Sequence, residues 1–141
     1  MIETKPAQHF AIQELVPEEV FLARGQRAWQ LIDNRLIENY DALREQLGTP
    51  ITINDWTSGG NRSASGLRVP GMAHFSLYSM HTFGKAGDSV CSIPAQDIRN
   101  MIKAGEIEMP HPACFEEFDG MSWFHMDVRN FSNGHTYFFK P

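Results

Sequence analysis

The stretch "YSMHTFGKAGDSV", residues 78–90, decides how the middle of this chain folds. His81 and Asp88 are seven residues apart, which is two turns of an α-helix, so a helix would place both side chains on one face. However, Gly84 and Gly87 lie between them, and each glycine weakens a helix by roughly 1 kcal/mol relative to alanine. Glycine also permits sharp turns and close backbone packing. The stretch therefore predicts a loop that leads into a strand at Asp88, with His81 and Asp88 brought together by the fold.

The segment before this stretch is predicted to be helical. Apolar residues recur mostly every three or four positions across residues 20–47, as in helices that bury one face. Pro17 favours a helix start, and Gly48 favours a helix end. Gly25 and the Asp-Asn pair at 33–34 are points where this segment can divide into two helices.

Strand-forming segments separated by long loops dominate the rest of the chain. Strands are predicted over residues 50–56, 87–93, 122–131 and 135–141, a short helix over 94–105, and irregular structure over 57–71 and 108–120. Helices that come first and strands that come later favour an α+β fold. We expect a single domain over residues 1–141, with the N-terminal helices packed on a small antiparallel sheet.

Charge and hydropathy limit the classes of partner. The chain has 12 Lys and Arg against 17 Asp and Glu, a net charge of −5, and no basic cluster, so nucleic acid is not an expected partner. No stretch approaches the ~20 apolar residues of a membrane span, and the N-terminus lacks a signal-peptide pattern. These features predict cytoplasmic synthesis. Cys91 and Cys114 lack zinc-finger spacing and are expected to be free thiols, with a disulfide between them as the alternative.

A second group of functional residue types lies late in the chain. On a strand, Trp123, His125 and Asp127 share one face, because side chains two residues apart point the same way. The intervening apolar residues then face the core, so the Trp-His-Asp face borders a cleft or solvent. An exposed strand face with incidental charges is the alternative interpretation.

Together, the two groups contain the ligands of a zinc site. His81, Asp88 and His125 supply two imidazoles and one carboxylate, and catalytic zinc takes three such protein ligands and keeps one position open. A metal held in this way activates water and polarises a carbonyl. The sequence therefore predicts a Zn²⁺ site at these three residues.

The motif that contains two of these residues resembles a known family. The segment "SMHTFGKAGD" is similar to the Ser-x-His-x-x-Gly-x-Ala-x-Asp motif of the zinc peptidases that include D-alanyl-D-alanine carboxypeptidases and phage endolysins. "WFHMDVR" resembles the family's second motif, a late histidine on a strand, and "TSGGNRS" resembles its Ser-Gly-Tyr-Arg-Ser segment. The resemblance spans residues 8–130 and implies a hedgehog and D-Ala-D-Ala peptidase-like fold.

The resemblance also implies roles for individual residues. His81, Asp88 and His125 match the zinc ligands, and Arg62 matches an arginine that stabilises the scissile carbonyl or its oxyanion. Ser79 and Trp123 are expected to contact substrate. The implied activity is hydrolysis of peptidoglycan stem peptides, by a D,D-carboxypeptidase or an endolysin that acts within a phage virion or is released to the cell wall.

Two positions depart from the family pattern. The family often has a Glu or Asp as general base three residues before the last histidine, where this chain has Ser122, and Asn61 replaces the tyrosine before the arginine. The base is then expected to be Asp127, or one of the acids Glu116, Glu117 and Asp119. The alternative is a relative that has lost its activity and serves as a structural or binding protein, for example beside other phage virion or tail proteins.

Overall fold

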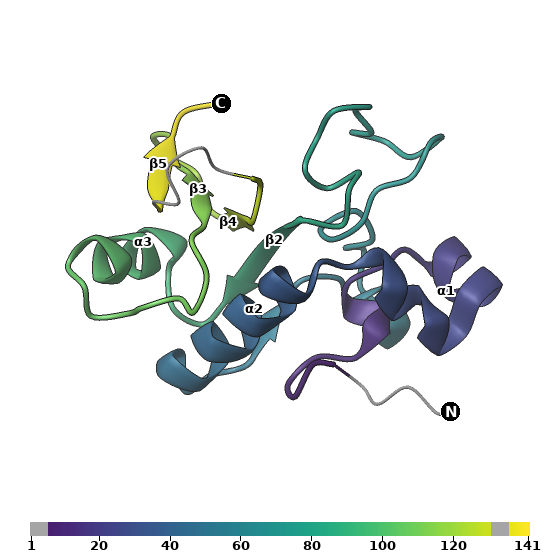
Figure 1. Ribbon diagram of the computed structural model, residues 1–141, viewed down its shortest axis with the longest axis horizontal. Coiled ribbons are helices and arrows are strands. Elements are labelled where there is room, and N and C mark those ends of the chain that lie inside the picture. The colour runs from purple at the N-terminus through teal and green to yellow at the C-terminus, as the bar shows by residue number, and fades with distance from the viewer. Residues whose placement is uncertain (1–5, 131–135) are drawn as a thin grey trace.

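The computed structural model describes residues 6–130 and 136–141 and has an α+β fold. Helices lead the chain and a five-stranded mixed sheet follows, with α1 and α3 at opposite ends of the molecule (Figure 1). In these two ranges, no helix is both long and apolar enough to cross a membrane. The elements are, in chain order, η1 Ile12–Glu14, α1 Glu18–Arg24, η2 Gly25–Leu31, α2 Asn34–Leu47, β1 Ile51–Thr52, η3 Trp56–Ser58, β2 Ala86–Cys91, α3 Ala95–Lys103, β3 Cys114–Glu116, β4 Phe124–Asp127 and β5 Tyr137–Phe139.

The helical half divides at the two predicted points. Pro17 precedes α1, and Gly25, with φ of 56°, ends it and begins the 3₁₀ helix η2. Asp33 then caps α2, since its carboxylate accepts a hydrogen bond from the backbone N–H of Arg35. Gly48 ends α2 in the left-handed conformation, with φ of 68°. The prediction of two α-helices is confirmed, with a 3₁₀ helix between them.

Helix α2 packs against β2 and so fixes which face of the sheet is buried. The hydroxyl of Tyr40, which is fully buried, donates a hydrogen bond of 2.9 Å to the carbonyl of Gly87. A Cβ atom on Gly87 would lie 2.7 Å from the Tyr40 ring, so only glycine permits this approach. Because side chains alternate along a strand, Asp88 then points away from α2.

The sheet is mixed, not antiparallel as predicted. Its strand order is β1-β2-β4-β3-β5, and every neighbouring pair is antiparallel except β3 and β5, which are parallel. β3 lies between β4 and β5. It runs antiparallel to β4 and parallel to β5. The prediction was wrong because residues 108–120, which were expected to be irregular, contain β3. Without this strand, the parallel pair that β3 forms with β5 could not be anticipated.

The other predicted segments agree in type and differ in length. β1 occupies two residues of the predicted strand 50–56, and β4 occupies four residues of the predicted strand 122–131, whose last residue is outside the described ranges. β5 lies within the predicted strand 135–141, whose first residue is outside the described ranges. After η3, residues 59–85 form the long loop drawn in teal at the upper right of Figure 1.

The two cysteines are free thiols. Cys91 is the last residue of β2, whereas Cys114 lies two strands away and pairs with Asp127, which pairs with Ala86 at the opposite end of β2. Each strand residue adds about 3.3 Å, so this separation far exceeds the reach of a disulfide. The alternative of a Cys91–Cys114 disulfide is therefore wrong.

Candidate metal centre

One row of residues across the sheet carries the site. In register, Asp88 of β2 lies beside His125 of β4, His125 lies beside Glu116 of β3, and Glu116 lies beside Phe139 of β5. The neighbouring residues Phe124 and Met126 are buried in the core. As predicted, the polar and apolar residues of β4 therefore occupy opposite faces.

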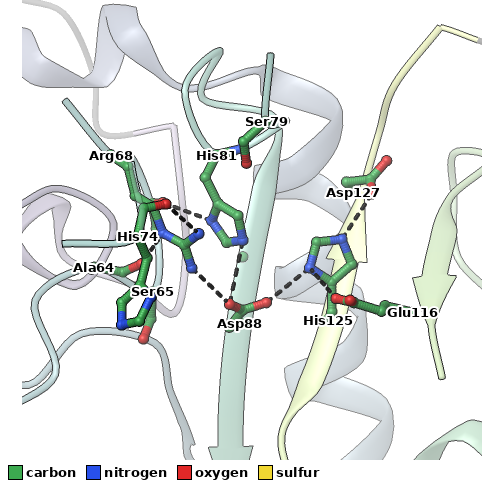
Figure 2. Close-up of polar contacts among 12 residues, drawn as sticks. Ala64, Ser65, Arg68, His74, Ser79, His81, Asp88, Glu116, His125 and Asp127 are labelled. Carbon is green, nitrogen blue, oxygen red and sulfur yellow. Dashed lines mark hydrogen bonds and ion pairs between the residues drawn. The ribbon is translucent and has the colours of Figure 1, made fainter. Parts of the chain in front are cut away.

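His81 reaches this row from the long loop. Gly84, with φ of 68°, turns the chain between His81 and β2. His81 Nε2 then lies 3.3 Å from Asp88 Oδ2, and Figure 2 shows His81 and His125 on opposite sides of this carboxylate. The prediction that a loop and a strand bring His81 and Asp88 together is confirmed.

Hydrogen bonds orient both imidazole rings toward Asp88. His81 Nδ1–H donates to the carbonyl of Gly66 at 2.9 Å, which leaves Nε2 to face Asp88. His125 Nε2–H donates to Asp127 Oδ2 at 2.8 Å, while Nδ1 lies 2.8 Å from Asp88 Oδ1. Such outer bonds fix the tautomer and ring orientation of metal-binding histidines.

The three side chains fit a divalent metal ion. One ligand atom from each of His81, Asp88 and His125 can be chosen so that all lie within 4.8 Å of one another. Both histidines are buried, and the donor set of two imidazole nitrogens and a carboxylate oxygen suits zinc and other first-row divalent metals. The structure thus brings together all three predicted ligands in a site able to hold a metal ion.

Charges around the centre shift the pKa values of its groups in opposite directions. Burial alone would raise the pKa of Asp88, but hydrogen bonds and charge interactions with His125 and His81 outweigh it and hold this pKa well below its usual range. Burial alone would lower the pKa of His125, but its bonds to Asp127 and Asp88 raise the pKa to about 9. At neutral pH, Asp88 is therefore ionised and His125 is protonated in protein that holds no metal.

Metal binding is consequently expected to release a proton. His125 Nδ1 must lose its proton to bind a metal, and a pKa of about 9 means that the proton is present at neutral pH. We expect release of about one proton per metal near pH 7.5, falling toward zero as the pH rises above this pKa. Calorimetric titration of metal-stripped protein with zinc, in buffers of different ionisation enthalpy, measures this number. A binding enthalpy that does not depend on the buffer would contradict the prediction.

The three candidate metal ligands line an open hollow, and the predicted arginine, Arg62, does not line it. Its guanidinium donates to the backbone carbonyls of Ile53, at 2.8 Å, and Asp88, at 3.3 Å. Arg68 lines the hollow instead and donates to Asp88 Oδ2 at 3.1 Å. The sequence analysis missed Arg68, although it lies only six residues after Arg62 in the same loop.

The hydrogen bonds of Asp127 suit a role in positioning His125 rather than a role in proton transfer. Asp127 is fully buried, and both of its oxygens accept hydrogen bonds of 2.7 Å from Arg129, while Oδ2 also accepts from His125. These partners leave the carboxylate little capacity to contact a substrate. Its geometry therefore supports a role in orienting His125.

The three candidate metal ligands lie at the floor of a hollow of about 400 Å³. Ser79 and Trp123, predicted to contact substrate, both line it. The Ser79 hydroxyl also accepts a hydrogen bond from the backbone N–H of His81, so it shapes the turn that carries this ligand. The remaining walls are formed by Arg68, His74, Tyr78, Met80, Glu116, Asp127, Arg129 and Phe139.

Ser122, at the expected position of the base, lies away from this hollow. It lines a separate small cavity with Cys91 and Phe124. Ser122 lies before the first residue of β4, and Phe124, which lines the same cavity, is buried in the core. Glu116 lies on the correct face, and its Oε2 is 3.7 Å from His125 Nδ1.

Comparisons of the chain with protein-family models, curated proteins and solved structures found no match.

Proposed function

We propose that the protein is a zinc-dependent peptidase that hydrolyses peptidoglycan stem peptides, as a D,D-carboxypeptidase or an endolysin does. The observation that carries the proposal is the convergence of His81, Asp88 and His125, each oriented by its own partners, at the floor of an open hollow. Zinc held by these residues would supply Lewis-acid activation of the peptide carbonyl and the attacking water. The resemblance of both motifs to the peptidase family agrees with this activity.

The hedgehog and D-Ala-D-Ala peptidase-like fold belongs to the same proposal. Its support is the order of elements, in which N-terminal helices precede a small sheet that carries the site on the face away from α2. A protein that acts on the cell wall fits release from the cell or a place in a phage virion, beside other phage structural proteins.

We assign the proton transfer in this reaction to Glu116. Its side chain lines the hollow and is 19% exposed, so it can contact both water and substrate. As the water oxygen bonds to the carbonyl carbon, Glu116 accepts the water proton and then delivers it to the leaving nitrogen as the C–N bond breaks. Among the remaining candidates, Glu117 forms ion pairs with Lys103 and Arg99, and Asp127 is held by Arg129.

Hydrolysis of purified muropeptides tests the proposal. We expect release of free D-alanine or a cleaved stem peptide by the zinc-loaded protein, loss of activity with a chelator, and recovery when zinc is restored. Glu116→Gln is expected to bind zinc normally and to lose roughly 10²–10⁴-fold in rate. Ser122→Ala, which changes the cavity on the other face, is the matched control and should retain activity. Zinc-loaded, folded protein that cleaves no muropeptide would instead favour the structural or binding protein considered from the sequence.

A further inference from the structure

Arg68 joins a metal ligand to the loop that forms one wall of the hollow. Its Nε–H donates to the carbonyl of Ala64 at 2.7 Å, one terminal nitrogen lies 3.5 Å from the carbonyl of His74, and the other donates to Asp88 Oδ2 at 3.1 Å. Its own backbone N–H donates to the carbonyl of His81. Figure 2 shows the guanidinium between the loop and the Asp88 carboxylate.

The position of this guanidinium is fixed by its surroundings. The side chain is 17% exposed, and a planar guanidinium held at Ala64 and Asp88 cannot rotate away without losing both bonds. By contrast, Arg62 donates only to the backbone carbonyls of Ile53 and Asp88 and forms no hydrogen bond with the Asp88 carboxylate. Arg68 is thus the arginine, among the described residues, that occupies a carboxylate oxygen of this ligand.

Occupation of Oδ2 has a consequence for metal binding. A carboxylate can bind a metal through one oxygen or through both, and a strong charge-assisted hydrogen bond to one oxygen opposes binding through both. With Asp88 limited to one oxygen, the three residues supply three donor atoms. A tetrahedral ion then keeps one position for water or substrate, as catalytic zinc sites do.

We propose that Arg68 is a positioning residue that limits Asp88 to one metal-binding oxygen and so keeps a coordination position open. The inference concerns the geometry of the centre and rests on the proposed function only in requiring that the three ligands hold a divalent metal.

The visible spectrum of cobalt(II)-loaded protein tests this inference without any measurement of activity. Four-coordinate cobalt(II) absorbs much more strongly than five- or six-coordinate cobalt(II). We expect the strong absorption for the natural protein and a severalfold weaker band for Arg68→Gln, because Asp88 then binds through both oxygens. Arg68→Lys keeps a cationic donor and is expected to restore most of the intensity.

Two controls separate this effect from a general loss of charge or structure. Arg27→Gln removes the same charge at an exposed position that does not line the hollow and should leave the spectrum unchanged. Arg62→Gln removes the arginine that bonds only to backbone near the site and should also keep the strong band. Circular dichroism confirms that each variant is folded before cobalt is added.

The inference is overturned if Arg68→Gln keeps the intensity of the natural protein, if the natural protein itself gives the weak band, or if Arg68→Lys fails to restore it. If the natural protein does not bind cobalt(II), this inference is overturned. If the natural protein does not bind zinc, the proposed function is overturned. Strong four-coordinate absorption without hydrolysis of muropeptides would overturn the proposed function alone.

Discussion

Replacing His81 with alanine is expected to abolish stabilisation of the protein by zinc. An ion that binds only the folded chain at about 1,000 times its Kd adds about 4 kcal/mol to the free energy of unfolding. For a chain of this size, that gain raises Tm by roughly 10 °C. His81 supplies one of three donors, so its loss removes this gain. The measurement is Tm by differential scanning calorimetry, with and without zinc.

His74→Asn provides a matched control for the His81 variant. His74 also lines the hollow but is outside the ligand group, and its backbone φ of 65° is one that asparagine tolerates. This variant should keep the full increase in Tm with zinc. An equal loss in His81→Ala and His74→Asn, or an increase that survives in His81→Ala, would contradict the assignment of the ligands.

Replacing Gly84 with alanine is expected to cost at least about 3 kcal/mol of folding free energy. A Cβ atom here would lie 1.8 Å from the carbonyl oxygen of Leu31, and the backbone φ of 68° already disfavours any side chain. The Gly84 carbonyl also accepts a hydrogen bond from the N–H of Asp33, at the start of α2. The methyl group would therefore separate the loop that carries His81 from the helical half. Urea denaturation followed by circular dichroism measures the loss.

Gly105→Ala separates backbone strain from the steric clash. Gly105 has a similar φ of 76°, but a Cβ atom there would meet nothing within 4 Å. We expect it to cost about 1–2 kcal/mol, from the left-handed backbone alone. Equal losses at the two glycines would show that the contact with Leu31 has no effect on stability.

Several parts of this structure follow from local sequence. The helix boundaries at Gly25, Asp33 and Gly48 were predictable, because capping and positive φ depend on a few neighbouring residues. The opposite faces of β4 were also predictable, since side-chain alternation is a local property of a strand. The three candidate ligands were predicted by residue type and motif, because zinc accepts only a few kinds of side chain.

Other parts depend on contacts between distant segments. The strand β3 lies within a loop-like segment and exists because β4 and β5 pair with it on both sides. Arg68 and Arg62 are both arginines of one irregular loop, and no local pattern distinguishes the one that reaches the Asp88 carboxylate from the one that bonds to backbone.

The stretch "YSMHTFGKAGDSV" contains both features set by local sequence and features set by contacts between distant segments. By itself, the sequence determined that residues 78–90 form a loop followed by a strand and that His81 and Asp88 are of residue types able to bind a metal. Only the tertiary structure decided that Glu116 lies beside His125 while Ser122 lines a separate cavity, and that Gly66 and Asp127 orient the two imidazoles. The physical reason is that strand register and loop packing are set by long-range contacts, whereas turns, caps and ligand chemistry are set by individual residues.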